Sequence, residues 1–294
     1  MANTLYTPEQ AARSTLAALR YLTTLPRTVR QDFSQDFVAG RGMVVNIKNP
    51  ITAGAARTYT QANRTARDAI VFDELDQDTI PVTMDTQVYK AIRLPDDFAT
   101  FTLTSLESEV IRPMAESVVD GVTAPLLTEM NAVATDASIP ALAADGSNAL
   151  AVLIAARAVL NARKVPMSDR YFALTPEAEA AFLNVEQLQK VNESGTDGVL
   201  RDAIIGRLLG FTIVTDPNLT TSVAYHRDAF AHVTRPSRAP EGAGFSATIA
   251  QDGFALRYLQ HYNPLQLEDQ AVADTFVGAE TISATRAVSV PDPV

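Results

Sequence analysis

Residues 104–134, TSLESEVIRPMAESVVDGVTAPLLTEMNAVA, form the longest helical pattern in the chain. Apolar residues recur there every four positions, and others widen the row into a stripe: Leu106, Val110, Met114, Val118, Val122, Leu126 and Met130, joined by Ile111, Val119 and Leu127. This spacing keeps one face of a helix against a core. Thr104 and Glu107 make a T-x-x-E capping box, which satisfies backbone N–H groups at a helix start. The stretch therefore predicts a long amphipathic helix.

Two prolines, Pro113 and Pro125, lie inside this helical stretch. Proline removes a helix hydrogen bond and clashes with the carbonyl group four residues earlier. We therefore expect the helix to bend, or to break near residues 121–125. A long bent helix would suit the strut of a flattened subunit. Two ordinary core helices joined at Gly121 fit the same periodicity.

Composition narrows the classes of protein that the chain can belong to. Its 294 residues, 47% of them hydrophobic, are enough for one to three domains with a core. The absence of cysteine excludes disulfides and thiolate zinc sites. A net charge of −10 disfavours a protein that grips nucleic acid, because phosphate contacts need clustered basic residues. We expect no signal peptide and no membrane span, since no basic leader and no long apolar run is present.

The first hundred residues contain little core-forming sequence. Residues 1–40 predict a helix at 7–24, stopped by Pro26, and then a tether; an ordinary first helix packed on the core is the alternative. Residues 41–100 read as a long β-excursion with strands at 43–48 and 56–60, a polar exposed part at 61–68, and a half-buried strand or bent pair at 80–94. An extended hairpin of this kind is marginal alone. It needs a surface to lie on, and a neighbouring subunit is one candidate.

The second half of the chain alternates helices and strands. Expected helices lie at 148–163, after the N-cap Thr175, and at 199–209; expected strands lie at 170–174, 211–215 and 229–233. These elements predict a compact α/β domain. Further strands are expected at 245–250, 254–262 and 280–290. Because they need partners, we expect the chain to return to the layer of the long helix, with the compact domain inserted.

The sequence shows no catalytic, cofactor-binding or metal-binding pattern. The three histidines, His226, His232 and His261, have no metal-ligand spacing, and we interpret them as surface or strand residues. There is no nucleophile elbow, P-loop or dinucleotide fingerprint. Acidic clusters occur at 73–78, at Asp96-Asp97 and at Glu268-Asp269. The first lacks the glycine and distal glutamate of a calcium loop, so a solvated acidic loop is the better interpretation.

Opposite charges lie close together in the β-excursion. The candidate contact residues are Arg57, Arg64, Arg67, Asp73, Glu74 and Asp76. Arginine makes bidentate contacts with carboxylates, so these residues are candidates for contacts between subunits. The alternative is exposed surface pairs that stabilise the protein by about 0–1 kcal/mol each.

The order of these parts resembles the major capsid (coat) protein of tailed double-stranded DNA bacteriophages. That family has the Hong Kong 97 capsid fold, which encapsulins also use. The strongest local likenesses are IPVTMDTQVYKAIRLPDDF at 80–98 running into TSLESEVIRPMAESV at 104–118, VLNARKVPMSDRYFALTPEAEAAFL at 159–183, and IGRLLGFTIVTDPNL at 205–219. In the family these are the returning E-loop strand with the spine helix, and two segments of the A-domain. The resemblance covers nearly the whole chain.

The resemblance implies an α+β capsid fold and a division into domains. The expected parts are an N-terminal arm at 1–40, an E-loop β-excursion at 41–100, a discontinuous P-domain at 101–145 and 245–294 with the spine helix at about 104–134, and an inserted A-domain at 146–244. In such a shell the E-loop lies over the neighbouring subunit and the A-domains cluster at the capsomer centre.

The implied function is that of a structural, non-enzymatic subunit without cofactors. Subunits would assemble into pentamers and hexamers of an icosahedral shell around double-stranded DNA, without sequence-specific contact. Implied partners are a separate scaffolding protein, a portal protein and, in some members, a decoration protein, with no membrane. The expected location is the virion capsid, assembled in the cytoplasm of the host bacterium.

The resemblance raises the question of a covalent crosslink and leaves two alternative functions. Some members form a covalent Lys–Asn crosslink, but this chain has only Lys48, Lys90, Lys164 and Lys190, and no matching asparagine or catalytic acid can be assigned. We therefore expect no crosslink. An encapsulin-like compartment shell is the nearest alternative function. A cytoplasmic α+β enzyme with an unrecognised site is the second.

Overall fold

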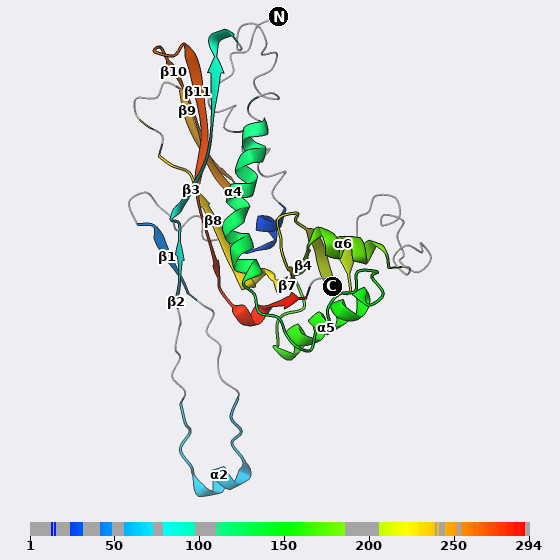
Figure 1. The fold of residues 1–294 in the computed structure, drawn as a ribbon. Helices are drawn as coiled ribbons and strands as arrows, with labels where there is room; N and C mark the ends of the chain where they lie inside the picture. Colours follow the sequence, from blue (N-terminus) through cyan, green and yellow to red (C-terminus); the bar gives the residue numbers. More distant parts are fainter. Residues whose placement is uncertain are drawn as a thin grey trace, which may run out of the picture.

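The computed structural model describes most of the second half of the chain and selected parts of the first. The described residues are 13, 15, 24–31, 42–48, 56–72, 79–97, 110, 112–185, 206–238, 240, 245–251 and 254–291. The molecule is elongated, with a long sheet and helix at one end, a compact lobe at the side and a narrow excursion at the other end (Figure 1). Within these residues no helix is long and apolar enough to cross a membrane.

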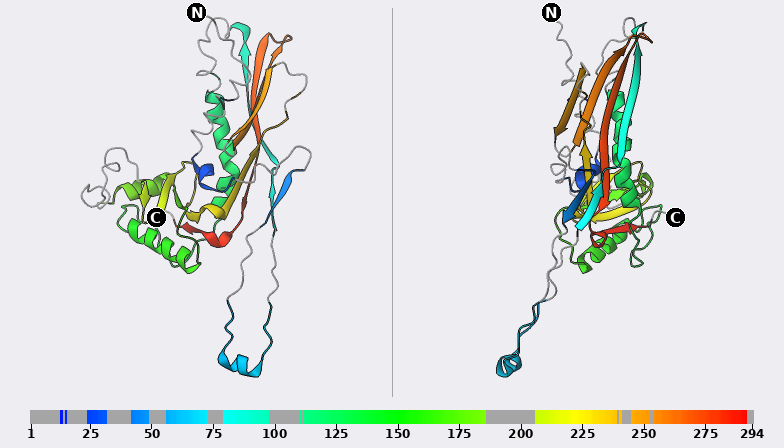
Figure 2. Two further views of the ribbon diagram at one scale, coloured as in Figure 1. Left: turned by 180° about the vertical axis from the view of Figure 1, so that it is seen from behind. Right: turned by 90° about the vertical axis from the view of Figure 1, so that its left-hand side faces the viewer.

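The long helix, α4, covers one face of an antiparallel sheet (Figure 2). It spans Arg112–Asn131, and the sheet order is β3 (Thr86–Pro95), β11 (Glu268–Thr281), β10 (Phe254–Asn263) and β9 (Phe245–Gln251), with β8 (Phe230–Arg235) also paired to β11. The predicted apolar stripe is buried: Met114, Val118, Val122, Leu126 and Met130 have no exposed surface. The amphipathic helix is confirmed over this range. It ends at Asn131 rather than at 134, and the expected start at Thr104 lies outside the described residues.

The helix runs without a break through Gly121 and Pro125, so a break at 121–125 and the alternative of two helices joined at Gly121 are wrong, whereas the expected bend stays a prediction. Gly121 has a packing role instead: an ideal Cβ there would lie 2.4 Å from a methyl carbon of Val88 on β3. The glycine lets the helix approach the sheet closely. Pro125 is tolerated because the buried stripe continues on both sides of it, and such packing supplies most of a helix's stability.

The compact lobe is a second sheet with two helices. The sheet order is β12 (Ala287–Val290), β7 (Ser222–His226), β4 (Arg170–Leu174), β6 (Phe211–Thr215) and β5 (Arg207–Leu208), with α5 (Ala149–Ala162) and α6 (Pro176–Leu183) packed on it. Strand β4 and helices α5 and α6 agree with the sequence prediction. The Thr175 side chain accepts a hydrogen bond from the amide of Ala178 at 3.2 Å, as an N-cap should.

The prediction of a helix at 199–209 is wrong over the part of this range that the structure describes. Residues 199–205 lie outside the described residues, and 207–208 form strand β5. Leu208 pairs with Phe211 across a two-residue loop, in which Leu209 and Gly210 both have positive φ, at 47° and 87°. That geometry belongs to a tight hairpin turn. Gly210 therefore reverses a strand rather than ending a helix.

Other local predictions also need correction. Residues 56–60 are irregular rather than a strand, and the polar segment after them contains helix α2 (Gln61–Ala66). The stretch at 80–94 is the bent pair, β2 (Thr79–Thr83) followed by β3. The expected strand at 280–290 is divided between the end of β11 and β12. Strand β7 and most of β11 were not predicted. In β11, small residues such as Ala271 and Ala273 give a weak alternation signal.

The two sheets exchange strands across the domain boundaries that the sequence suggested. Strand β8 lies within 146–244 but pairs with β11, and β12 lies within 245–294 but pairs with β7. Near the N-terminus, Leu25 and Val29 are buried in the core beside α4 and β7. The amide of Arg30 donates to the carbonyl of Phe230 at 3.2 Å. Residues 25–30 are thus part of the core, and not a tether.

Candidate functional site

The foot of the β-excursion is anchored on the main sheet. Strand β1 (Val44–Lys48) pairs antiparallel with β2, from Val44 opposite Thr83 to Lys48 opposite Thr79. Buried side chains on these strands pack against β8 and the chain after β11: Ile47, Val82 and Met84 against Ala231, Val233 and Ile282. At Gly278 of β11 an ideal Cβ would lie 2.4 Å from the carbonyl oxygen of Thr83, so only glycine allows this close crossing.

The far end of the excursion is a small, internally bonded tip, which we define as residues 56–72. Its helix α2 has no buried residue and stands well away from the body (Figure 1). Tyr59 Oη donates to the carbonyl oxygens of Asn63 at 3.1 Å and Asp68 at 2.7 Å. Asn63 also donates from Nδ2 to the Asp68 carboxylate at 2.9 Å, and forms a capping box with Thr60. These bonds link α2 to the residues on either side of it within the tip.

The structure places the three candidate arginines together on the tip. Arg57 precedes α2, Arg64 lies in it, and Arg67 ends it in the left-handed conformation with φ of 52°. All three are exposed. The acidic candidates Asp73, Glu74 and Asp76 lie outside the described residues. The proposed pairing of the two sets therefore stays a prediction.

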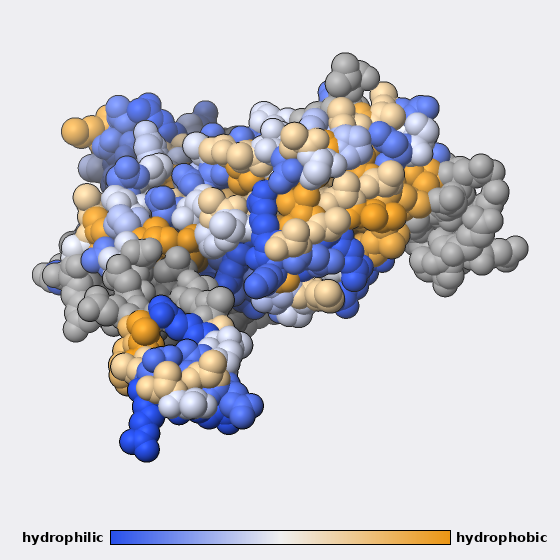
Figure 3. Space-filling view, turned by 90° about the horizontal axis from the view of Figure 1, so that it is seen from below, coloured by the Kyte–Doolittle hydropathy of each residue, from blue (hydrophilic) through white to orange (hydrophobic). Residues whose placement is uncertain are grey.

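Sequence reasoning missed the apolar surface beside these arginines. Ile70, Val71 and Phe72 are 69%, 60% and 90% exposed, which is unusual for three consecutive large apolar residues. The run of apolar letters was the available signal. Seen from below, the surface at the end that carries the tip shows hydrophilic and hydrophobic side chains side by side (Figure 3). The described part of the tip thus exposes both basic and apolar side chains.

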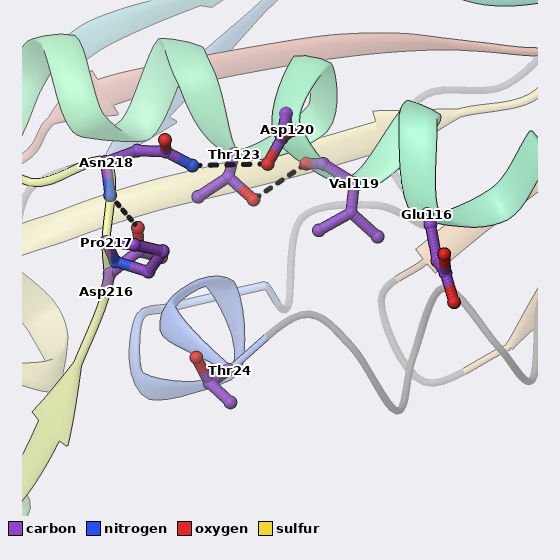
Figure 4. A pocket seen from close by; sticks show the side chains of 8 residues that line it. All are labelled: Thr24, Glu116, Val119, Asp120, Thr123, Asp216, Pro217 and Asn218. Atoms are coloured by element: carbon purple, nitrogen blue, oxygen red, sulfur yellow. Dashed lines mark hydrogen bonds between the residues drawn. The ribbon is translucent and has the colours of Figure 1, made fainter. Parts of the chain in front are cut away.

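A cavity of about 250 Å³ lies where α4 meets the turn after β6 (Figure 4). Eight residues line it: Thr24, Glu116, Val119, Asp120, Thr123, Asp216, Pro217 and Asn218. The side-chain Nδ2 of Asn218 donates to the Asp120 carboxylate at 3.1 Å, and the backbone N–H of Asn218 donates to the Asp216 carboxylate at 2.9 Å. The turn at 216–218 therefore joins the compact lobe to the long helix.

The chemistry of this cavity is that of a structural junction. Burial raises the pKa of Asp216, and the nearby Asp120 charge acts in the same direction, whereas the Asn218 amide lowers it. Among the described residues no group of three or more acidic or histidine side chains is arranged to hold a metal ion. The Thr123 hydroxyl, which lines the cavity, donates to the carbonyl oxygen of Val119 at 2.9 Å. We assign it no catalytic role.

The histidines lie apart from one another and from this cavity. His226 ends β7, His232 is central in β8, and His261 is exposed near the end of β10. His232 is fully buried, and its Nε2 lies 3.0 Å from the carbonyl oxygen of Val122 on α4. A carbonyl oxygen only accepts, so Nε2 donates to it. Because burial lowers the pKa of the ring, the ring is neutral and Nδ1 carries the lone pair. The three residues are strand histidines, as expected from sequence.

The buried ring of His232 should make the protein less stable in acid. Burial lowers its pKa from 6.5 to about 4. The unfolded chain therefore binds the proton more tightly, and stability present above pH 6.5 is lost as the pH falls towards 4, by on the order of 3 kcal/mol.

Denaturant unfolding of the wild type and of His232→Leu over this pH range would test the expectation. The variant lacks the titrating ring, while every other ionisable group is retained in both chains. Its free energy of unfolding should fall less steeply as the solution is acidified. If the free energy of unfolding falls equally with pH in the two proteins, His232 is not the cause of the loss of stability in acid.

Comparisons with known proteins identify the fold. No protein-family model and no curated protein sequence matches the chain. Among solved structures, a chain of Mycobacterium phage Che8 matches with a TM-score of 0.68 at 19% identity, covering 91% of this chain and 90% of that one. The capsid structure of Cyanophage P-SCSP1u matches with a TM-score of 0.59 at 10% identity, covering 85% and 84%. The virus-like particle from Pyrococcus furiosus matches with a TM-score of 0.55 at 10% identity, covering 98% and 100%.

These likenesses extend over almost the whole of the chain and of its structural neighbours. They show that the chain has the α+β fold of phage capsid proteins. The fold class and the resemblance drawn from the order of elements are confirmed at that level. At such low identity the similarity concerns the path of the backbone and not the surface residues.

Proposed function

We propose that this protein is the structural subunit of an icosahedral virus shell that encloses double-stranded DNA, as in tailed bacteriophages. The observation that carries the proposal is the match of 91% of the chain to a phage protein chain of nearly the same extent. A fold alone does not establish function, so local features must agree with it. One of them is the excursion, whose helix α2 has no buried residue.

The excursion supports self-assembly most directly. Its tip has no buried residue in α2 and exposes three consecutive large apolar side chains. Burying apolar surface gains roughly 25 cal/mol for each Å² removed from water, so such a segment is stabilised by lying on another protein. In a shell, that protein is the next subunit. The excursion would then act as the E-loop of the capsid fold.

The other parts take corresponding places in this proposal. Helix α4 would be the spine helix, its sheet β3-β11-β10-β9 with β8 the P-domain, and the compact lobe with β12 the A-domain at the centre of a capsomer. Residues 1–40 would be the N-terminal arm, with 25–30 fixed in the core. In this proposal the domains are divided by strand pairing, so that β8 belongs to the P-domain and β12 to the A-domain, and not at the expected boundaries 146–244 and 245–294.

The proposed partners follow from the shell function. The subunit would form pentamers and hexamers, assemble in the cytoplasm of a bacterial host with a separate scaffolding protein, and incorporate a portal protein. A decoration protein is a further partner found with some shells. A net charge of −10 suits a wall that must not hold the packaged DNA tightly. No enzymatic activity and no cofactor is part of the proposal.

A compartment shell of the encapsulin kind is the second candidate. The similarity to the Pyrococcus furiosus virus-like particle, which spans 98% of this chain, favours keeping it. The Che8 chain has the higher TM-score, 0.68 against 0.55, so the phage function is preferred. Neighbouring genes for a terminase and a portal protein would support the phage shell, and a neighbouring cargo enzyme would support the compartment.

Negative-stain microscopy with light scattering tests the proposal. The full-length protein, expressed alone and together with the products of its neighbouring genes, should yield closed shells, tubes or capsomer rings. Particles filled with DNA in infected cells would identify the phage shell. A protein that stays monomeric under both conditions would contradict the shell function.

A further inference from the structure

The chain crosses between its two sheets at two places that contact each other. Strand β7 of the compact lobe leads through a short 3-10 helix, η4 (Arg227–Ala229), into β8 of the main sheet. Strand β11 of the main sheet leads through η5 (Ala284–Arg286) back to β12 of the lobe, the red segment below the main sheet in Figure 1. Because η4 and η5 pack together, contacts between them help to hold the lobe against the main sheet.

An ion pair and backbone hydrogen bonds join the two crossings. The carbonyl oxygen of Ala229 accepts from the backbone N–H groups of Ile282 at 2.8 Å and Ser283 at 3.1 Å. Arg286 Nη1 donates to the Asp228 carboxylate at 3.0 Å. The two charged side chains are 24% and 36% exposed, so water screens their attraction only in part. We call these five residues the crossing clasp.

A buried histidine lies directly beside the clasp. His226, the last residue of β7, is 5% exposed. Its Nδ1 accepts a hydrogen bond from the backbone N–H of Asp228 at 3.1 Å, and the ring thereby acts as the N-cap of η4. A nitrogen that accepts carries a lone pair, so the ring is neutral in this arrangement. The same Nδ1 lies 3.8 Å from the Asp228 carboxylate, which places the ring against both the backbone and the charge of the clasp.

Charged groups from three elements surround this ring. They are Asp228 on η4, Arg286 on η5, and Asp169 and Arg170 at the start of β4. Burial lowers the pKa of His226, and the two arginines act in the same direction, whereas the two aspartates raise it. The nearby charges are two of each sign, so burial decides the direction. The ring is therefore neutral at neutral pH and takes up a proton only in acid.

We infer that protonation of His226 opens the crossing clasp, so that the contact between the lobe and the main sheet weakens as the solution becomes acidic. A proton on Nδ1 removes the acceptor of the Asp228 N–H and sets two N–H groups against each other. It also places a second cation beside the Asp228 carboxylate, which His226 and Arg286 must then share. The clasp lies within one chain, so the inference does not depend on the shell function.

The direction of the pH effect follows from linkage. The ordinary pKa of a histidine is 6.5, and the pKa of His226 in the closed clasp lies below that value. An open crossing, in which the ring is hydrated, therefore binds the proton more tightly than the closed one. The closed clasp is favoured above pH 6.5 and loses that advantage as the pH falls through the lowered pKa.

Hydrogen exchange of the full-length protein between about pH 8 and about pH 5 tests the inference. The readout is the exchange rate of the Ile282 and Ser283 amides, corrected for the intrinsic effect of pH on exchange. In the wild type their protection should fall roughly tenfold towards acid, a factor on the scale of one hydrogen bond. The amides that pair β10 with β11 should keep their protection and serve as the internal reference.

Two variants separate the ring from the ion pair. His226→Asn keeps an oxygen that can accept from the Asp228 N–H but has no titrating group, so protection at 282–283 should stay high at every pH. Asp228→Asn keeps the backbone N–H and removes the charge, so protection should be low at both ends of the pH range. Both variants retain His232 and His261, so any effect of those rings is common to all three proteins.

Each outcome decides for or against the clasp. A loss of protection in the wild type that is absent from His226→Asn supports the inference. Constant protection in the wild type, or an equal loss in His226→Asn, overturns it, and wild-type protection in Asp228→Asn overturns the part assigned to the ion pair. If His226→Asn does not fold, the midpoint of the wild-type loss is compared with the titration of the His226 ring by NMR. Coincidence supports the inference, and a difference of more than about one pH unit overturns it.

Discussion

Replacing residues 49–78 with an Asn-Gly turn should give a folded monomer that forms no shells. Lys48 and Thr79 are opposite each other in the β1–β2 pair, so a two-residue turn can join them without changing the register. The buried side chains of the foot, Ile47, Val82 and Met84, are retained. The deleted segment includes α2, which buries nothing. The body should therefore keep its stability, while the assembly contact is lost.

Sedimentation and thermal unfolding of the shortened chain would check both halves of this expectation. The melting temperature should match that of the unassembled wild type, and the sedimentation should be that of a monomer under conditions in which the wild type assembles. A chain of equal length, in which 49–78 is replaced by a glycine-serine linker, controls for the change in size. Shells formed by either variant at wild-type yield would show that the excursion is dispensable.

Asp274→Ala should strongly destabilise the main sheet. The side chain of Asp274 is 1% exposed, and its carboxylate accepts hydrogen bonds from Arg257 Nε at 2.7 Å, from Gln87 Nε2 at 2.8 Å and from Ser237 Oγ. The three donors come from three separate segments of the chain, which this one carboxylate on β11 connects. Its removal leaves the guanidinium of Arg257 largely buried without its charge partner, which costs about 3–5 kcal/mol in free energy of unfolding.

Chemical denaturation of the unassembled chain would measure this loss. The matched control replaces both members of the pair, Arg257→Met with Asp274→Leu. It leaves no unpaired charge and should recover most of the stability. Asp85→Ala, at an exposed site beside the same sheet, should change the free energy of unfolding by less than about 0.5 kcal/mol. A loss at Asp274 as small as that at Asp85 would show that the network does not stabilise the sheet.

Local patterns in the sequence predicted elements whose signals lie within a few residues. The stripe on α4 was recognised because a four-residue apolar repeat has one structural solution, a helix with one buried face. The cap at Thr175 and the strand at 170–174 were recognised for the same reason. Element type follows from neighbouring residues when each of them favours the same conformation.

Signals that depend on packing were misread. Gly121 was interpreted as a possible joint between two helices, and Gly210 lies directly after an expected helix. One lets α4 approach β3, and the other forms a hairpin turn with Leu209. A glycine permits many conformations, so its neighbours in space determine which one is used. Strand β11, the centre of the main sheet, was missed because its buried face carries small residues, whose burial is decided by the strands on either side.

The sequence by itself determined the long amphipathic helix, the α/β character of the segment after it and the absence of thiol chemistry, and these features indicated the class of fold. Only the tertiary structure decided which surfaces meet. It paired β8 with the main sheet and β12 with the compact lobe, and it placed the acidic residues at 96–97 beside those at 268–269. The physical reason is that a helix or strand is specified by contacts within a few residues, whereas strand pairing and surface charge depend on residues that only folding brings together.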